Sequence, residues 1–175
     1  TMNYQKTILS TVAALGLAMG VAQAAKIKIG VVLPYSGGAA QFGEQIDRGM
    51  NLFMNQHEAA FGGHEIELIK RDSKRPGGDI AKNAVQELIT RQKVDLLTGF
   101  VFSPNAMASA PLITQGKVPM VIMNAGTAWI PKLSPYIARV SFTMWHAGYP
   151  LGGYAKEKLS CNTAVIGYTN YPPGK

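Results

Sequence analysis

The sequence is poor in the residues that carry redox and metal chemistry. Cys161 is the only cysteine among 175 residues, so the chain can form neither an internal disulfide nor a cysteine-based metal site. The three histidines, His57, His64 and His146, share no spacing typical of metal ligands. We expect the thiol of Cys161 to be buried and inert, because it stands beside a predicted strand. The sequence implies no cofactor and no metal.

The motifs of nucleotide-binding proteins and of common hydrolases are also missing. Gly38 and Gly43 have the spacing of a P-loop, but Glu44 stands where a P-loop carries its lysine, and a carboxylate there would repel phosphate. No G-x-G-x-x-G fingerprint and no G-x-S-x-G elbow occurs. Ser103 could be a nucleophile at a strand end, yet no histidine is marked as its partner. We therefore expect a protein that is not an enzyme.

Acidic residues are fewer than basic ones. The chain carries 10 acidic and 17 basic residues, which gives a formal net charge of +7. The one dense basic patch consists of Lys70, Arg71, Lys74 and Arg75. It could meet an acidic partner or nucleic acid, but no aromatic residue interleaves with it and no helix-turn-helix or zinc-finger spacing is present. We interpret it as a solvated strand end and expect no nucleic-acid partner.

Long apolar runs are absent outside the N-terminus. Lys6 precedes an apolar segment from Ile8 to Val21, and Ala22-Gln23-Ala24 fits the small-x-small cleavage pattern. The run of about 15 residues is shorter than the roughly 20 that span a membrane. Residues 1–24 are therefore predicted to be a signal peptide, so that a mature chain beginning at Ala25 is exported. A retained N-terminal anchor is the alternative.

From Lys26 onward, apolar strand patterns alternate with helical ones. The predicted strands cover 27–33, 65–70, 94–98, 118–123, 137–140 and 163–168. The predicted helices cover 46–54, 80–89, 104–116 and 145–159, with Asp79 and Ser103 as the expected N-caps of the second and third. This alternation predicts a mostly parallel, doubly wound α/β sheet covered by helices on both faces.

Small polar residues follow three of the predicted strands. Ser36 follows the first, Ser103 the third, and the segment 124–127 the fourth. Because the carboxyl ends of parallel strands lie at one edge of the sheet, a ligand is expected there. Hydroxyls together with free amides at a helix N-terminus suit a carboxylate. Three aromatic residues could supply the apolar walls of such a site: Phe42, Phe102 and Trp145.

Four stretches of the chain resemble the leucine/isoleucine/valine-binding protein family, the type I periplasmic solute-binding proteins of ABC transporters. They are IKIGVVLPYSGGAAQFGEQIDRGMNL, FGGHEIELIKRDSKRPGGDIAKNAVQELI, GFVFSPNAMASAPLI, and VPMVIMNAGT with PYIARVSFT. The resemblance covers 26–175 and only the first half of such a protein. It implies a two-lobed fold, of which 25–141 would be the N-terminal ligand-binding lobe and 142–175 the beginning of a truncated second lobe.

The resemblance also implies roles for individual residues. Ser103 matches the serine that binds the ligand carboxylate, and Ala125 and Thr127 match the alanine and threonine that hold it through backbone and hydroxyl groups. Phe42 stands where amino-acid binders often carry tyrosine. Trp145 stands where they often have small or acidic residues. In the loop 170–174, Pro173 replaces an aromatic residue that often lines the cleft of these proteins.

The function implied is that of a periplasmic solute-binding component of an ABC importer. Its solute would be a small carboxylate, a branched-chain amino acid or a related amino acid, and its partners would be the permease subunits in the membrane. The departures at Phe42, Trp145 and Pro173 leave the solute open. The alternatives are a binder of an aromatic or aliphatic acid or of a short amide, and a ligand-sensing receptor or regulatory module of the same fold.

Overall fold

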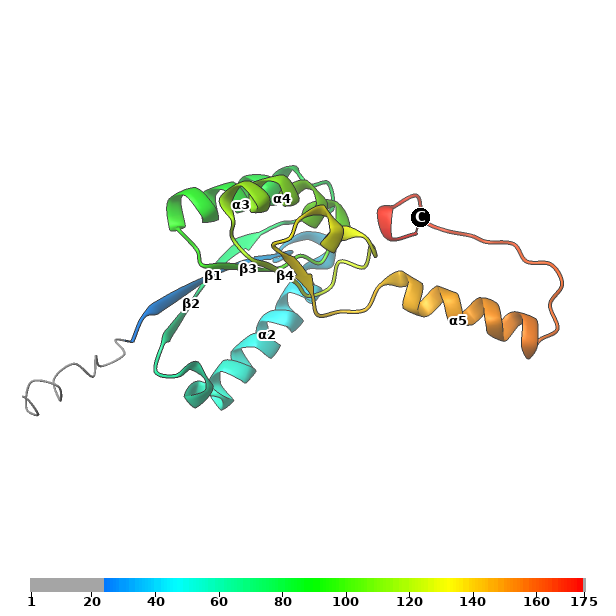
Figure 1. Ribbon diagram of the computed structural model, residues 1–175, viewed down its shortest axis with the longest axis horizontal. Coiled ribbons are helices and arrows are strands. Elements are labelled where there is room, and N and C mark those ends of the chain that lie inside the picture. Colours follow the sequence, from blue (N-terminus) through cyan, green and yellow to red (C-terminus); the bar gives the residue numbers. More distant parts are fainter. Residues whose placement is uncertain (1–23, 175) are drawn as a thin grey trace, which may run out of the picture.

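A five-stranded sheet with parallel neighbours forms the centre of the molecule (Figure 1). The computed structural model describes residues 24–174, so the predicted signal peptide lies outside the described residues except for Ala24. The order in the sheet is β2-β1-β3-β4-β5, with bounds β1 Lys26–Leu33, β2 Glu65–Asp72, β3 Leu96–Gly99, β4 Met120–Ile122 and β5 Ile137–Arg139. The predicted parallel α/β sheet is confirmed, although β3 and β4 are shorter than the apolar runs suggested.

Helices cover both faces of this sheet. Helices α3 (Asp79–Glu87) and α4 (Ser103–Gly116) lie on one face, and α2 (Ala40–Gln56) lies on the other (Figure 1). The remaining elements are α5 (Met144–Glu157), the π-helical turn η3 (Leu88–Gln92), and the 3₁₀ turns η1 (Gly37–Ala39), η2 (Glu58–Phe61), η4 (Ile130–Leu133) and η5 (Pro172–Gly174). The larger core lies under α3 and α4, and a smaller one, built on Val31, Leu33 and Val101, lies on the other face.

Strand β1 is the buried strand that its apolar run predicts. Val31, Val32 and Leu33 are wholly buried, because successive side chains enter opposite faces of the sheet and helices cover both. Pro34 follows the last strand residue, as expected of a residue without an amide hydrogen. Strand β2 lies at the edge of the sheet, in agreement with its alternating polar and apolar sequence.

The glycine at position 43 has a packing role. Gly43 is the buried residue of α2, and a Cβ placed on it would stand 2.1 Å from the carbonyl oxygen of Pro34. Only glycine therefore lets the start of α2 come this close to the end of β1. The second glycine of the P-loop-like spacing is thus explained by contact between helix and strand, whereas a Cβ at Gly38 would meet no atom within 4 Å.

The predicted N-cap role of Asp79 is wrong by one residue. Gly78 occupies the cap position with φ 92°, in the left-handed region, and Asp79 is the first helical residue. The Asp79 carboxylate accepts a hydrogen bond from Arg75 and makes no capping bond. The Gly78 amide instead donates to the buried side chain of Asn105, which ties this loop to α4.

Two predictions for the C-terminal part are wrong. Residues 163–168 form no strand, and Val165, Ile166 and Tyr168 are exposed. Cys161 is also exposed rather than buried. A strand needs a hydrogen-bonded neighbour, and this segment runs clear of the sheet after α5, which itself extends away from the lobe (Figure 1). The chain then returns, so that η5 lies near α4.

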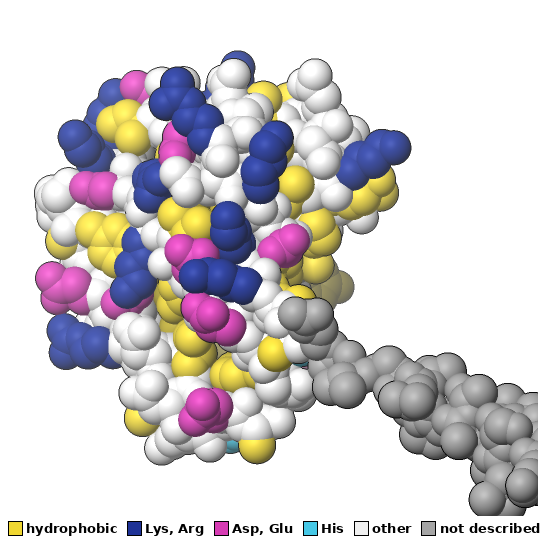
Figure 2. Space-filling view, turned by 90° about the vertical axis from the view of Figure 1, so that its left-hand side faces the viewer, with side chains coloured by type: hydrophobic (Ala, Val, Ile, Leu, Met, Phe, Trp, Pro, Cys, Tyr) yellow, Lys and Arg dark blue, Asp and Glu magenta, His cyan; other side chains and the backbone are white. Residues whose placement is uncertain are grey.

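The basic patch predicted from the sequence is largely neutralised. Lys70 pairs with Asp47 at 2.7 Å, and Arg71 pairs with Glu87 at 2.7 Å. Arg75 pairs with Asp79, as noted above. Figure 2 shows basic and acidic side chains interspersed on the face of the molecule opposite α5. Within residues 24–174, none of the helices combines the length and the apolar character needed to cross a membrane.

Candidate functional site

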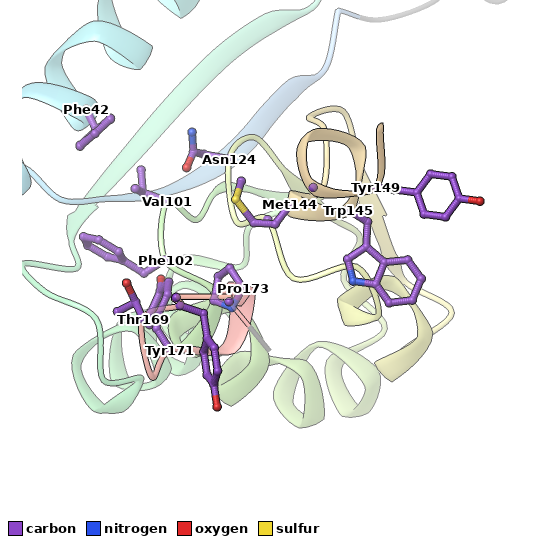
Figure 3. A pocket seen from close by; sticks show the side chains of 15 residues that line it. Phe42, Val101, Phe102, Asn124, Met144, Trp145, Tyr149, Thr169, Tyr171 and Pro173 are labelled. Atoms are coloured by element: carbon purple, nitrogen blue, oxygen red, sulfur yellow. The ribbon is translucent and has the colours of Figure 1, made fainter. Parts of the chain in front are cut away.

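A cavity of about 870 Å³ opens where the sheet's carboxyl edge faces α5 and the C-terminal segment (Figure 3). Its wall is mostly apolar and contains neither an acidic nor a basic side chain among its lining residues. These are Phe42, Val101, Phe102, Asn124, Gly126, Met144, Trp145, Gly148, Tyr149, Gly167, Tyr168, Thr169, Tyr171, Pro173 and Gly174.

The order of the strands determines where this cavity lies. Strand β1 pairs with β2 on one side and with β3 on the other, and β4 follows β3, all in parallel. The segments that leave β1, β3 and β4 therefore meet at one edge, where α/β sheets bind ligands. Of the residues predicted for the site, Phe42, Phe102 and Trp145 line the cavity. Ser36, Ser103, Ala125 and Thr127 are not among the lining residues, and the Ser36 hydroxyl donates to the Asp72 carboxylate.

Ser103 and Thr127 contact each other directly beneath the cavity wall. Both are buried, and the Ser103 Oγ accepts a hydrogen bond of 3.2 Å from the Thr127 amide. They follow Phe102 and Gly126 in the chain, which themselves line the cavity. The Oγ1 of Thr127 is buried and has no hydrogen-bond partner among residues 24–174. Two hydroxyl protons thus remain for a ligand, one from each residue.

The predicted N-cap role of Ser103 is wrong. Phe102 occupies the cap position of α4 and makes no capping bond through its side chain, and Ser103 is the first residue of the helix. The Ser103 hydroxyl instead accepts a hydrogen bond from the Thr127 amide, which reaches it because β3 and β4 are neighbours. Pro104 occupies a position in the first turn, where its missing amide hydrogen costs nothing.

Ala125 anchors the loop after β4. It is wholly buried, and its amide donates to the carbonyl of Phe100 at 2.9 Å. Phe100 has φ 60°, in the left-handed region, so the chain turns sharply where β3 ends. This bond holds the loops after β3 and β4 together and thereby fixes Thr127 beside Ser103.

Tyr171 is a residue of the site that the sequence analysis missed. Its Oη accepts a hydrogen bond of 3.2 Å from the Ser103 amide at the start of α4, and its side chain points toward that helix in Figure 3. Burial raises the pKa of the Tyr171 hydroxyl, so the hydroxyl stays protonated at neutral pH. The resemblance directed attention to the position of Pro173, which does line the cavity, but not to Tyr171 two residues earlier.

Arg139 holds Thr127 from the other side. Its Nη2 donates to the Thr127 carbonyl at 2.6 Å, and burial lowers the pKa of its guanidinium. Thr127 therefore has both backbone groups engaged, its amide by Ser103 and its carbonyl by Arg139. Between residues 24 and 174, no cluster of three or more histidine, cysteine, aspartate or glutamate side chains could hold a metal ion.

A parallel sheet that presents paired hydroxyls and a cavity at its carboxyl edge defines the class: this is the lobe of a type I periplasmic binding protein. The chain belongs to the periplasmic binding protein family, which matches residues 26–175. This agrees with the resemblance stated from the sequence. Proteins of this family, and the solved structures that the chain resembles, are solute-binding proteins rather than enzymes.

Among curated proteins, the chain is 36% identical over 170 residues to the Leu/Ile/Val-binding protein homolog 6 of Brucella abortus, covering 97% of this chain. It spans 43% of the length of that relative. Among solved structures, it is similar to an ABC-transporter solute binding protein from R. palustris in complex with 4-hydroxybenzoate. That match has 41% identity, a TM-score of 0.80, and coverage of 85% of this chain and 40% of the other.

A second solved structure is a leucine binding protein from Thermotoga maritima, with 28% identity and a TM-score of 0.68, covering 77% of this chain and 38% of the other. A third is a solute binding protein from Rhodopseudomonas palustris BisB5 in complex with 3,4-dihydroxybenzoic acid. It has 37% identity and a TM-score of 0.76, covering 85% of this chain and 40% of the other. The relatives of this fold thus include binders of aromatic acids and proteins named for amino acids.

Proposed function

We propose that this chain supplies the carboxylate-binding lobe of a periplasmic solute-binding protein of an ABC importer, and that its solute is an aromatic acid of the hydroxybenzoate type. One observation carries the proposal. The buried hydroxyls of Ser103 and Thr127 stand together at the start of α4, directly beneath an uncharged cavity walled by aromatic rings.

The hydroxyl pair supports a carboxylate as the group that is bound. The N-terminus of α4 carries a partial positive charge from the helix dipole, which favours an anion. The Ser103 hydroxyl accepts a bond from the Thr127 amide and still has its proton to donate, and the Thr127 hydroxyl has no partner among the described residues. Both hydroxyls can therefore donate to the two oxygens of a carboxylate.

The cavity supports an aromatic body for the solute. Phe42 and Phe102 lie on one side of it, and Trp145 lies on α5 at the other (Figure 3). An aromatic ring buries a large apolar area against such walls and stacks favourably on them. The R. palustris proteins in complex with 4-hydroxybenzoate and 3,4-dihydroxybenzoic acid, at 41% and 37% identity, support the same class of solute.

A branched-chain amino acid is the second candidate, and the name of the Brucella relative favours it. An amino acid brings an ammonium group, which needs an acidic side chain or several acceptors when it is buried. The lining residues include no aspartate or glutamate, and Phe42 has no hydroxyl to offer. The higher identity to the two aromatic-acid complexes, 41% and 37% against 28% for the leucine binding protein, also favours an aromatic acid.

In the proposed cycle the solute is bound in the periplasm between this lobe and a facing lobe. Contacts with both lobes favour the closed form by hinge rotation, and the closed form docks on the permease subunits in the membrane. The C-terminal segment that carries Tyr171 belongs to the facing side, because it reaches the cavity from beyond α5.

Calorimetric titration of the full protein tests this proposal with four solutes: 4-hydroxybenzoate, benzoate, 4-hydroxybenzamide and leucine. We expect the two benzoates to bind most tightly and leucine at least about 100-fold more weakly, since an unpaired ammonium would be buried. Tight binding of leucine together with no binding of either benzoate would refute the aromatic solute. Turnover of a benzoate ester or amide would refute the assignment as a binding protein.

Tyr171→Phe is expected to weaken binding of 4-hydroxybenzoate about tenfold. The Tyr171 hydroxyl accepts a hydrogen bond from the Ser103 amide, and its proton can be donated to the solute carboxylate, so the variant loses this bond to the solute. The ring stays, so the apolar wall is kept. The matched control is Tyr154→Phe on α5, whose side chain is 55% exposed. Unchanged binding by Tyr171→Phe would show that this hydroxyl does not contact the solute, and tighter binding would show that it competes with the solute for the Ser103 amide.

A further inference from the structure

Arg139 is a cation at the end of β5 whose charge has no acidic partner among residues 24–174. Its Nη2 donates to the Thr127 carbonyl, while its Nε and Nη1 are buried and make no hydrogen bond within the described part of the chain. Within that part, the buried side-chain atoms without a partner belong to Thr127, Arg139 and Ser141. Two of these three residues, Thr127 and Arg139, are hydrogen-bonded to each other.

Such an arrangement carries a cost that a nearby anion would reduce. Arg139 is partly buried, so its guanidinium loses part of its hydration, and that cost is recovered through an opposite charge or hydrogen bonds. Arginine does not relieve this cost by releasing its proton, because its guanidinium stays charged in proteins. The positive charge therefore persists beside Thr127, and its field reaches across the short distance to any solute held by the Thr127 hydroxyl.

Arg139 does not line the cavity, so it acts through Thr127 and through its charge. Its bond to the Thr127 carbonyl complements the bond from the Thr127 amide to Ser103, and the two together fix where the Thr127 hydroxyl stands. Thr127 is 3% exposed, which leaves this hydroxyl little freedom to move.

We propose that Arg139 is the positioning residue that gives the cleft its preference for anionic solutes over neutral solutes of the same shape. Arg139 holds Thr127 in place and supplies a positive charge. A bound carboxylate neutralises this charge without direct contact with the Arg139 side chain. This inference rests on the proposed carboxylate site and adds the residue that selects for charge.

The test compares benzoate with benzamide, which have similar shapes and differ in charge. In Arg139→Gln we expect benzoate to bind about tenfold more weakly and benzamide to change less than about twofold, because only the anion interacts with the lost charge. The control is Arg48→Gln on α2, where the arginine side chain is 76% exposed and its pair with Glu44 lies on the surface. It should leave the affinities for both solutes unchanged.

Arg139→His supplies a second readout that a purely structural role would not move. Histidine with an ordinary pKa near 6.5 gains charge between about pH 8 and pH 5.5, whereas benzoate stays ionised over that range. We expect the ratio of benzoate to benzamide affinity to rise as the pH falls in this variant and to stay constant in the wild type. If Arg139→Gln fails to fold, the pH dependence of the affinity ratio in Arg139→His tests the role of Arg139 instead.

Equal losses of benzoate and benzamide affinity in Arg139→Gln, or a constant ratio in Arg139→His, would overturn the role of Arg139 in charge selection. These outcomes leave the proposed function standing, provided that the wild type binds benzoate. Failure of the wild-type protein to bind both benzoate and 4-hydroxybenzoate would overturn the proposed function and this inference together.

Discussion

Removing the hydroxyls of Ser103 and Thr127 together is expected to weaken binding of 4-hydroxybenzoate by at least about 100-fold. Each hydrogen bond to a charged group contributes on the order of 1.5–3 kcal/mol, and two such bonds correspond to two or more decades of affinity. The double variant Ser103→Ala, Thr127→Val keeps the shape of the site. Calorimetric titration of this variant against the wild type measures the loss.

Its control is Ser109→Ala, which removes another wholly buried hydroxyl from α4. Ser109 donates to the carbonyl of Asn105 within the helix and lies outside the cavity wall. This control should bind 4-hydroxybenzoate as the wild type does. Ser103→Ala also leaves the Thr127 amide without its acceptor, so thermal unfolding of each variant is needed to separate lost stability from lost contacts. Wild-type affinity in a folded double variant would place the carboxylate elsewhere.

Gly43→Ala is expected to destabilise the fold by about 1–3 kcal/mol or more, because its Cβ would stand 2.1 Å from the carbonyl oxygen of Pro34. Both groups belong to backbone, so neither can move without shifting α2 or β1. Phe42, the preceding residue, lines the cavity, and a shift of α2 would move it. We therefore expect a lower midpoint of thermal unfolding and weaker solute binding together.

Gly49→Ala in the same helix is the matched control. A Cβ at Gly49 meets no atom within 4 Å, so the added methyl group should be neutral or stabilise α2 by about 0.5–1 kcal/mol. Thermal unfolding followed by circular dichroism compares the two variants directly. Equal stability of Gly43→Ala and Gly49→Ala would contradict the close contact between α2 and β1.

Much of the fold could be predicted because its signals are local. The apolar run ending at Pro34, the alternation in Glu65–Asp72 and the helical spacing from Ile46 to Met54 each lie within one element. Their alternation along the chain favours a parallel order, since a crossover helix usually joins parallel strands. The strand pattern in the sequence predicted each of the five strands that form.

The segment 163–168 shows where local reasoning fails. Its apolar residues have the pattern of a strand, but a strand forms only beside another strand, and the structure places none next to it. The exposure of Cys161 follows from the same fact, since the thiol was expected to be buried by that strand. Strand pairing depends on the whole sheet, so the sequence of six residues does not predict it.

The candidate site was predictable in part for the same reason. Ser103 and Thr127 follow strands whose carboxyl ends must meet, so their proximity could be inferred, but the direction of the bond between them could not. Tyr171 reaches Ser103 from 68 residues further along the chain. Arg139 lies on the last strand of the sheet, and its contact with Thr127 depends on how the loop after β4 folds back.

A crystal structure of the full protein with 4-hydroxybenzoate tests the central claim most directly. The account predicts that the carboxylate lies at the start of α4, within hydrogen-bond distance of the Ser103 and Thr127 hydroxyls. It also predicts that the ring lies against Phe42 and Phe102. A solute whose carboxylate points away from α4, or lies outside the cavity, would contradict it.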